Sequence, residues 1–154
     1  MSHGRNAAVL PPDQVGAIIA SSGNEQFVRD LGADEFVDYT QQPFEAVVKD
    51  MDVVFDTVGG DTSTQAFQTL KKSGFLVAAP EPPSEEKARE LGVQAAWVFC
   101  KPNAQQLAKI NGLIEEGKLN IHIDTVLPLT EVKKAHQLSQ SRRTRGKIVL
   151  QIGT

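Results

Sequence analysis

Short apolar runs that are typical of β-strands alternate with segments of helical periodicity along nearly the whole chain. This alternation limits the possible folds more than any other feature, because strands joined by helices usually pair in parallel. Runs 53–55 and 75–79 are continuously apolar, as expected of strands buried on both faces. The sequence therefore predicts an α/β fold with a mostly parallel sheet and helices on both faces. The strand-like runs are 16–20, 35–39, 52–55, 75–79, 95–99, 121–127 and 147–152.

Capping residues predict where the helices between these strands begin and end. One helix is expected to begin at the capping-box pair Ser22 and Glu25, and another at Thr62 and Gln65. The second of these helices should continue through Leu70, which completes its apolar stripe. The remaining helices are expected over 84–91 before Gly92, from near Asn103 to Gly117, and from Thr130 onward.

Composition excludes several classes of protein. The chain has 154 residues and a formal net charge of -3, which suits one domain and gives no general affinity for nucleic acid. Residues 1–20 contain only short apolar stretches, broken at Pro11 and Pro12, so we expect neither a signal peptide nor a membrane partner. Cys100 is the only cysteine, which leaves no intrachain disulfide and no metal-ligand spacing. A cytoplasmic protein without a metal site is the expectation.

The run 52–60 ends in the pair Gly59 and Gly60 at the carboxyl end of a predicted strand. Ligands of open parallel sheets bind beyond such strand ends, where glycine lets them approach the main chain. A tight strand-to-helix turn with a left-handed conformation would require the same glycines. Taken alone, the glycine pair favours the tight turn.

A resemblance to a known family changes that balance. The segments LGADEFVDY (31–39), DVVFDTVGG (52–60), GKL (117–119), PLTEVKKAH (128–136) and GKIVLQI (146–152) have the order and spacing found in medium-chain dehydrogenase/reductases. The chain most resembles the zinc-free, quinone-oxidoreductase-like branch and its zinc-type alcohol dehydrogenase relatives. The resemblance implies a Rossmann-like domain that binds NAD(P) and presents the nicotinamide for hydride transfer.

The resemblance also implies which residues lie at the nicotinamide end of the cofactor. Val58 and Gly59 would line the nicotinamide-ribose side. Phe99 and the segment 80–81 would lie near the nicotinamide ring. No side chain of this chain is a convincing general acid or base, so we expect no catalytic residue in it.

At the adenosine end the resemblance implies a preference for NADP(H) over NAD(H). Ser21 and Ser22 stand where NAD-preferring enzymes place an acid for the ribose 2′-hydroxyl. Tyr39 matches a tyrosine beside the adenosine phosphate, and Arg142 matches an arginine that reaches the 2′-phosphate in some members. Structural roles remain open for three of them: a helix cap for Ser22, a cover for the sheet end for Tyr39, and a solvated loop for Arg142.

Other polar residues are expected to have structural roles. His136 falls within a helix, and His122 alternates with the isoleucines of a strand. Cys100 has no basic partner that sequence could place, and is expected to be a buried small hydrophobe and not a nucleophile. The acids Glu85 and Glu86 suit a helix start and do not form an acid/base pair.

The glycine-rich dinucleotide fingerprint is absent before run 16–20. We therefore expect residues 1–15 to lie outside the family region, and residues 16–154 to form a truncated NAD(P)-binding Rossmann-like domain that lacks its first βα unit. The predicted function is the cofactor-binding portion of an NADPH-dependent oxidoreductase acting on quinones, enones or alcohol–carbonyl pairs, inactive as an isolated chain. The alternative is a non-catalytic dimerising module with weak or no nucleotide binding.

Loss of the first strand predicts association between chains. That strand would lie between runs 16–20 and 52–55, and its removal leaves backbone groups unpaired on both. These two runs close up, residues 6–10 fill the gap, or another chain does so. A homo-oligomer is expected, either through such strand exchange or as a dimer through edge strand 95–99, whose Trp97 and Phe99 suit an apolar interface.

Overall fold

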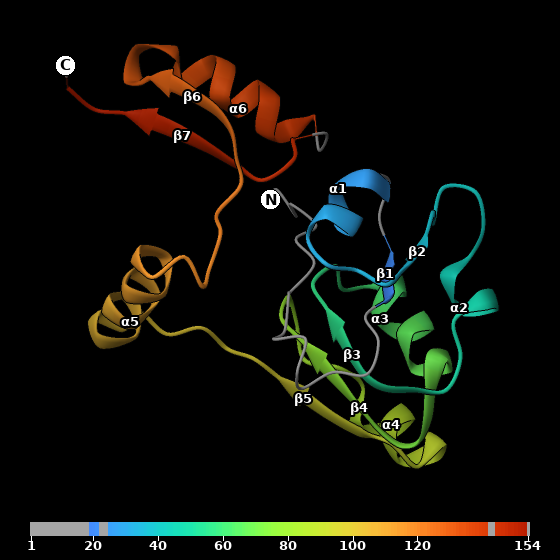
Figure 1. Ribbon diagram of the computed structural model, residues 1–154. Coiled ribbons are helices and arrows are strands. Elements are labelled where there is room, and N and C mark those ends of the chain that lie inside the picture. Colours follow the sequence, from blue (N-terminus) through green and yellow to red (C-terminus); the bar gives the residue numbers. More distant parts are fainter. Residues whose placement is uncertain (1–18, 22–24, 142–143, 154) are drawn as a thin grey trace. The chain divides into compact units, whose positions relative to one another are not determined.

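The computed structural model describes residues 19–21, 25–141 and 144–153, which fall into two compact units that divide between Phe99 and Cys100 (Figure 1). The first unit contains β1 (Ile19–Ser21), α1 (Glu25–Asp30), β2 (Glu35–Val37), α2 (Phe44–Val47), β3 (Met51–Asp56), α3 (Asp61–Ala66), η1 (Phe67–Thr69), β4 (Leu70–Ala78), α4 (Glu85–Leu91) and β5 (Gln94–Trp97). The second contains α5 (Ala104–Glu115), β6 (Ile123–Pro128), η2 (Leu129–Glu131), α6 (Val132–Gln140) and β7 (Lys147–Gln151).

Every strand pair within the described residues is parallel, which confirms the predicted α/β fold. β1 pairs with β2, the strands β3, β4 and β5 form a three-stranded sheet in that order, and β6 pairs with β7. The crossover connections between β3, β4 and β5 contain α3 and α4, as parallel pairing requires. This arrangement brings the carboxyl ends of β3, β4 and β5 to one edge.

The core of the first unit lies between β4 and the helices that follow β3 and β4. Leu76 of β4 is fully buried in a cluster with Ala66, Phe67 and Ala88, which come from α3, η1 and α4. The opposite face of the sheet is exposed at Val53 (58%) and Phe55 (45%). Burial on one face follows the alternation of side chains along each strand, so the expectation that run 53–55 is buried on both faces is wrong.

No pairing joins β1 to β3 among the residues that the structure describes. The predicted loss of a strand between them stays a prediction. Residues 6–10, which the sequence offers to fill the gap, lie outside the described part of the chain. The sheet of the first unit is accordingly divided into a two-stranded and a three-stranded part.

Two sequence predictions about element boundaries are wrong, and one short element was not predicted. The helix expected to continue through Leu70 ends at Ala66, because Leu70 pairs with Met51 as the first residue of β4. The Thr62–Gln65 capping box does not form: the N-cap is Gly60, whose carbonyl oxygen accepts the N–H of Ser63. The short helix α2 was not predicted, since its four residues are too few to show a period.

Two other helix starts were predicted correctly. The Ser84 hydroxyl accepts the N–H of Lys87 at the start of α4, which ends at Gly92 in a left-handed conformation. The Asn103 side chain accepts the N–H of Gln106 at the start of α5. The expected start at Ser22 lies outside the described residues.

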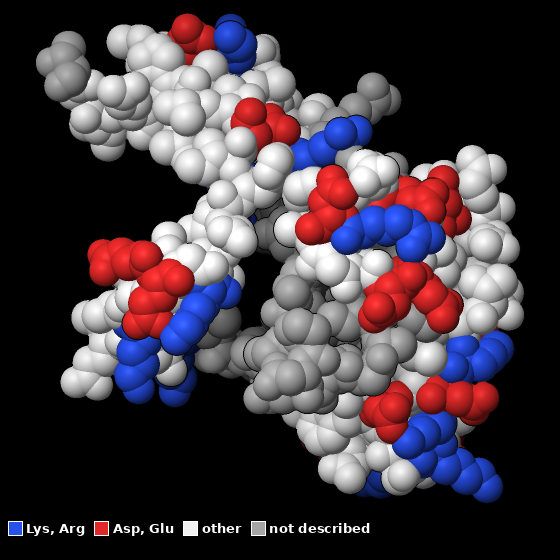
Figure 2. All heavy atoms as spheres, in the orientation of Figure 1, with Lys and Arg blue, Asp and Glu red and all other residues white. Residues whose placement is uncertain are grey.

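In the second unit α6 packs against β6 and β7. Leu127 of β6 and Ala135 of α6 are buried between them, whereas α5 has no fully buried residue. Cys100, which precedes α5, is exposed, so the expectation that it is buried is wrong. None of the helices in the described part of the chain is long and apolar enough to cross a membrane. On the face shown in Figure 2, acidic and basic side chains lie interspersed over the first unit.

Candidate functional site

The carboxyl end of β3 carries a buried acid that shapes the turn after it. Asp56, the last residue of β3, is only 4% exposed. Its Oδ1 accepts the backbone N–H of Val58 at 2.8 Å and that of Gly59 at 3.1 Å. Its Oδ2 is buried without a hydrogen-bond partner. An acid that accepts from the N–H two residues later stabilises a tight turn in place of continued strand.

The glycine pair is required by this turn and by the segment that follows β4. Gly59 and Gly60 have φ angles of 81° and 61°, which lie in the left-handed region that favours glycine. A Cβ on Gly59 would lie 3.2 Å from Pro80 Cβ and 3.3 Å from Glu81 Oε1. The close neighbour of the Gly59 backbone is therefore the chain's own segment 80–81.

Glu81 completes the hydrogen bonding of the turn. Its Oε1 accepts the backbone N–H of Gly60 at 2.7 Å. The three successive N–H groups of Val58, Gly59 and Gly60 thus all donate to carboxylates of this chain. This turn places two acids at the edge where parallel α/β sheets bind ligands, and its own N–H donors are already engaged.

The neighbouring strands end at the same edge. The Ala79 N–H donates to the Asp56 carbonyl and the Val98 N–H to the Ala78 carbonyl, each at 2.9 Å, so the pairing extends past the strand ends. Phe99 follows β5 and is 61% exposed, with its ring centroid 5.0 Å from that of Trp97. Val58, Gly59 and Phe99 therefore follow strands of one three-stranded sheet, at its carboxyl edge.

The predicted adenosine-end residues are only partly described. Ser21 ends β1 in register with Val37 of β2, and Tyr39 follows β2, so both lie beyond carboxyl ends of paired strands. Ser22 and Arg142 lie outside the described residues. The cofactor roles of all these residues, and of Val58, Gly59 and Phe99, remain predictions.

Sequence reasoning did not select Asp56, and it named Glu81 only as part of a segment. A signal for Asp56 was present: an acid that ends an apolar strand just before a glycine pair is typical of a side-chain-stabilised turn. No local signal could have found Glu81, because its contact with Gly60 joins residues 21 positions apart in the sequence.

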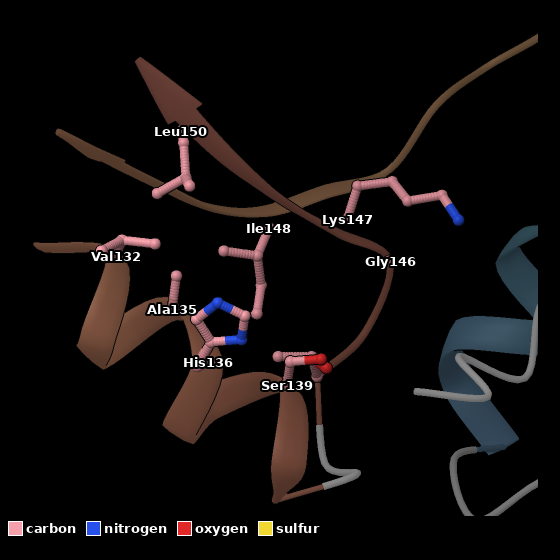
Figure 3. Close-up of a pocket in the computed structure, with 9 residues that line it drawn as sticks. Val132, Ala135, His136, Ser139, Gly146, Lys147, Ile148 and Leu150 are labelled. Atoms are coloured by element: carbon pink, nitrogen blue, oxygen red, sulfur yellow. The ribbon is translucent and has the colours of Figure 1, made fainter. Parts of the chain in front are cut away.

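The second unit contains a shallow open pocket of about 340 Å³ between α6 and β7 (Figure 3). It combines apolar side chains with one imidazole, hydroxyl groups and one lysine. Its lining residues are Val132, Ala135, His136, Ser139, Thr144, Gly146, Lys147, Ile148 and Leu150. No acid lines it, so the pocket has no carboxylate–histidine pair for acid/base chemistry.

The loop that leads into β7 is held by β6. Asp124 accepts the backbone N–H of Arg145 at 3.1 Å and the hydroxyl of Thr125 at 2.9 Å. These hydrogen bonds, the one from Arg145 first, hold the pKa of Asp124 below its ordinary value. The Lys147 N–H donates to the His122 carbonyl at 2.9 Å, so this connection is fixed at both ends of Gly146.

A family model described as zinc-binding dehydrogenase matches residues 31–150. The chain belongs to this family. The match spans both compact units and identifies the chain as the C-terminal, NAD(P)-binding part of a medium-chain dehydrogenase/reductase. In the part of the chain that the structure describes, no group of three or more His, Cys, Asp and Glu residues could hold a metal ion.

Individual relatives agree with this assignment. A probable mitochondrial zinc-binding oxidoreductase of Arthroderma benhamiae is 33% identical, over 84% of this chain and 42% of the relative. The mitochondrial NAD(P)H oxidoreductase RTN4IP1 of Danio rerio is 28% identical, over 88% of this chain and 42% of the relative. The quinone oxidoreductase structure from Coxiella burnetii is 31% identical, with a TM-score of 0.76, over 88% of this chain and 44% of that one. The chain thus spans less than half the length of each of these three relatives. The similarity to the Coxiella burnetii structure confirms the Rossmann-like fold.

Proposed function

We propose that this chain supplies the nicotinamide end of the cofactor site in an NADPH-dependent reductase of quinones, enones or related carbonyl compounds, and that the isolated chain is not active. The names of the relatives support the reaction class, since they include an NAD(P)H oxidoreductase and a quinone oxidoreductase. A cytoplasmic location is part of the proposal, although both curated relatives are named as mitochondrial. Recovery of the protein with mitochondria would contradict that location.

The observation that carries the proposal is the turn Asp56–Gly60 at the carboxyl edge of the β3–β4–β5 sheet. Its two left-handed glycines follow β3, and Phe99 follows β5 at the same carboxyl edge, with β4 between these two strands. A flat aromatic ring fits beside Gly60, because nothing lies within 4 Å of the position that a Cβ would take there, whereas Pro80 and Glu81 lie against Gly59. The nicotinamide would supply the hydride chemistry when bound, and the residues of this chain would hold the nicotinamide ring in position.

The same turn does not fit a phosphate group. The N–H groups that would bind it already donate to Asp56 and Glu81, whose charges repel an anion. Pyrophosphate binding in this fold uses a glycine-rich helix start, and no such sequence precedes β1 here. For the 2′-phosphate we propose Ser21, Ser22, Tyr39 and Arg142, which offer hydroxyl donors and a positive charge.

Titration of the purified chain with NADPH and NADH, followed by nicotinamide fluorescence or calorimetry, tests the proposal. We expect micromolar binding of NADPH and weaker binding of NADH, because only NADPH carries the phosphate that Arg142 would contact. Arg142→Ala should remove the difference between the two cofactors, whereas Arg143→Ala, which removes the same charge one residue later, should keep it. Equal affinities in the unmodified chain would contradict the NADPH preference.

The second candidate function is a non-catalytic dimerising module with weak or no nucleotide binding. The exposed apolar residues at the end of edge strand β5 support this candidate. Trp97, Val98 and Phe99 are all exposed at the end of β5, which is unusual for three successive large apolar residues. Absent or millimolar cofactor binding in the titration would support this candidate.

Both candidates include a homodimer through β5. We expect sedimentation velocity to show a dimer that Phe99→Lys converts to a monomer, because a buried unpaired charge opposes an apolar interface. Val47→Lys, at an equally apolar exposed position of α2, serves as the control and should leave the dimer intact. A monomeric unmodified chain would exclude this interface.

A further inference from the structure

The acids at the Gly59–Gly60 turn have a consequence for which state of the cofactor binds there. The side chains of Asp56 and Glu81 together accept three backbone N–H groups. Asp56 Oδ2 is buried and has no hydrogen-bond partner, so its negative charge is only partly compensated. A group that binds against this turn therefore lies near the hydrogen-bond acceptors and the negative charge of the Asp56 and Glu81 carboxylates.

Among the parts of a nicotinamide cofactor, one changes its charge during the reaction. Phosphates are anionic in both redox states, and the riboses are neutral in both. The nicotinamide ring is neutral in NADPH and carries one positive charge in NADP⁺. The change arises because the ring transfers a hydride, that is, one proton and two electrons, to the substrate. A carboxylate near the ring therefore favours the oxidised form over the reduced form.

We infer that the negative charge of Glu81 raises the affinity of this site for NADP⁺ relative to its affinity for NADPH. Glu81 would thus help to determine which redox state of the cofactor the site prefers. Its Oε1 accepts the Gly60 N–H at 2.7 Å and lies 3.3 Å from the position that a Cβ on Gly59 would take, so the carboxylate lies against the glycine pair. This inference rests on the proposed function, because it requires the nicotinamide to lie at the turn. The inference gives a specific role to the Glu81 side chain. The family resemblance implied only that segment 80–81 lies near the nicotinamide ring.

Glu81 can be tested separately from the fold, whereas Asp56 cannot. Asp56 is buried and holds two backbone N–H groups, so its replacement would change the turn itself. Glu81 is exposed, and its one hydrogen bond in the turn is to the N–H of Gly60. The amide oxygen of glutamine can accept the same N–H, so Glu81→Gln removes the charge and retains the contact.

The expected effect is moderate because Glu81 is exposed to solvent. Charge pairs at such positions are weakened by water and by salt. We expect Glu81→Gln to lower the ratio of NADP⁺ affinity to NADPH affinity by roughly two- to fivefold in low-salt buffer. The change should shrink when the ionic strength is raised above physiological values.

The experiment measures dissociation constants of NADP⁺ and NADPH by calorimetry for the full chain and two variants. Glu81→Gln is compared with Glu90→Gln, which makes the same change in net charge at an exposed position of α4. Only Glu81→Gln should change the affinity ratio, and thermal unfolding should show both variants folded. The ratio isolates the ring charge, because the rest of the cofactor is identical in the two states.

Each other outcome identifies what is wrong. If both cofactors bind and Glu81→Gln leaves the ratio unchanged, the inference fails while the proposed function stands. If Glu81→Gln tightens both cofactors equally, a phosphate and not the ring lies at the turn, and the inference is again overturned. If the unmodified chain binds neither form, the proposed cofactor function fails and the inference fails with it.

Discussion

Replacement of Gly146 by alanine is expected to destabilise the β6–β7 pair by about 3 kcal/mol or more. Gly146 has a φ of 98°, and a Cβ there would overlap the carbonyl oxygen of His122. The same oxygen accepts the N–H of Lys147 at 2.9 Å, so the backbone cannot move away without loss of that hydrogen bond. Amide hydrogen exchange of Val126 and Val149 should measure the loss, because these residues pair in the middle of the two strands.

Gly112→Ala provides a matched control for this prediction. Gly112 lies inside α5, has an ordinary helical φ, and has open space where a Cβ would be added. The identical substitution should therefore stabilise α5 by about 0.5–1 kcal/mol, since alanine favours helix over glycine. Similar exchange rates in Gly146→Ala and the unmodified chain would show that the His122–Gly146 contact is not as close as described.

The predicted positions of the strands came from apolar periodicity, and this signal was sufficient for most of the fold. Parallel pairing followed from the alternation of strands with helices, and the structure has only parallel pairs among its described residues. The signal failed at Leu70, because its spacing from Ala66 and Phe67 also fits a buried helical stripe. Its pairing with Met51 is a contact between distant residues, which no local pattern contains.

Helix ends were predictable where one side chain decides them. Ser84 and Asn103 each accept a backbone N–H three residues later, and the residue type alone indicates this role. Thr62 has the same type but does not act as a cap, because the turn held by Asp56 moves the helix start to Asp61. The turn stabilised by Asp56 thus overrides the local preference of Thr62 for a capping position.

The candidate site was predictable in place but not in composition. A glycine pair at the end of an apolar strand indicated the turn, and the structure confirms left-handed conformations at both glycines. Which groups approach the glycines depends on the segment after β4, so neither Pro80 nor Glu81 could be assigned from sequence. The structure confirms the tight turn, and the approach of a ligand to these glycines stays a prediction.

Replacement of Leu76 by alanine is the second substitution with a large expected effect, a loss of about 2–5 kcal/mol in the free energy of unfolding. Leu76 is 0% exposed and contacts the buried cluster of Ala66, Phe67 and Ala88. Its truncation removes apolar contacts and leaves a cavity that the surrounding helices fill only in part. Urea unfolding followed by the fluorescence of Trp97, the only tryptophan, reports on this unit directly.

Val53→Ala is the matched control for Leu76→Ala, because the two residues are on opposite faces of the same sheet. Val53 pairs with Phe75, the neighbour of Leu76, and is 58% exposed, so its truncation should cost less than about 1 kcal/mol. A large difference between the two variants would show that α3 and α4 cover the stabilising face. Equal losses would mean that something covers the Val53 face in solution, and a shift of the Val53→Ala midpoint with protein concentration would then identify a second copy of the chain as that cover.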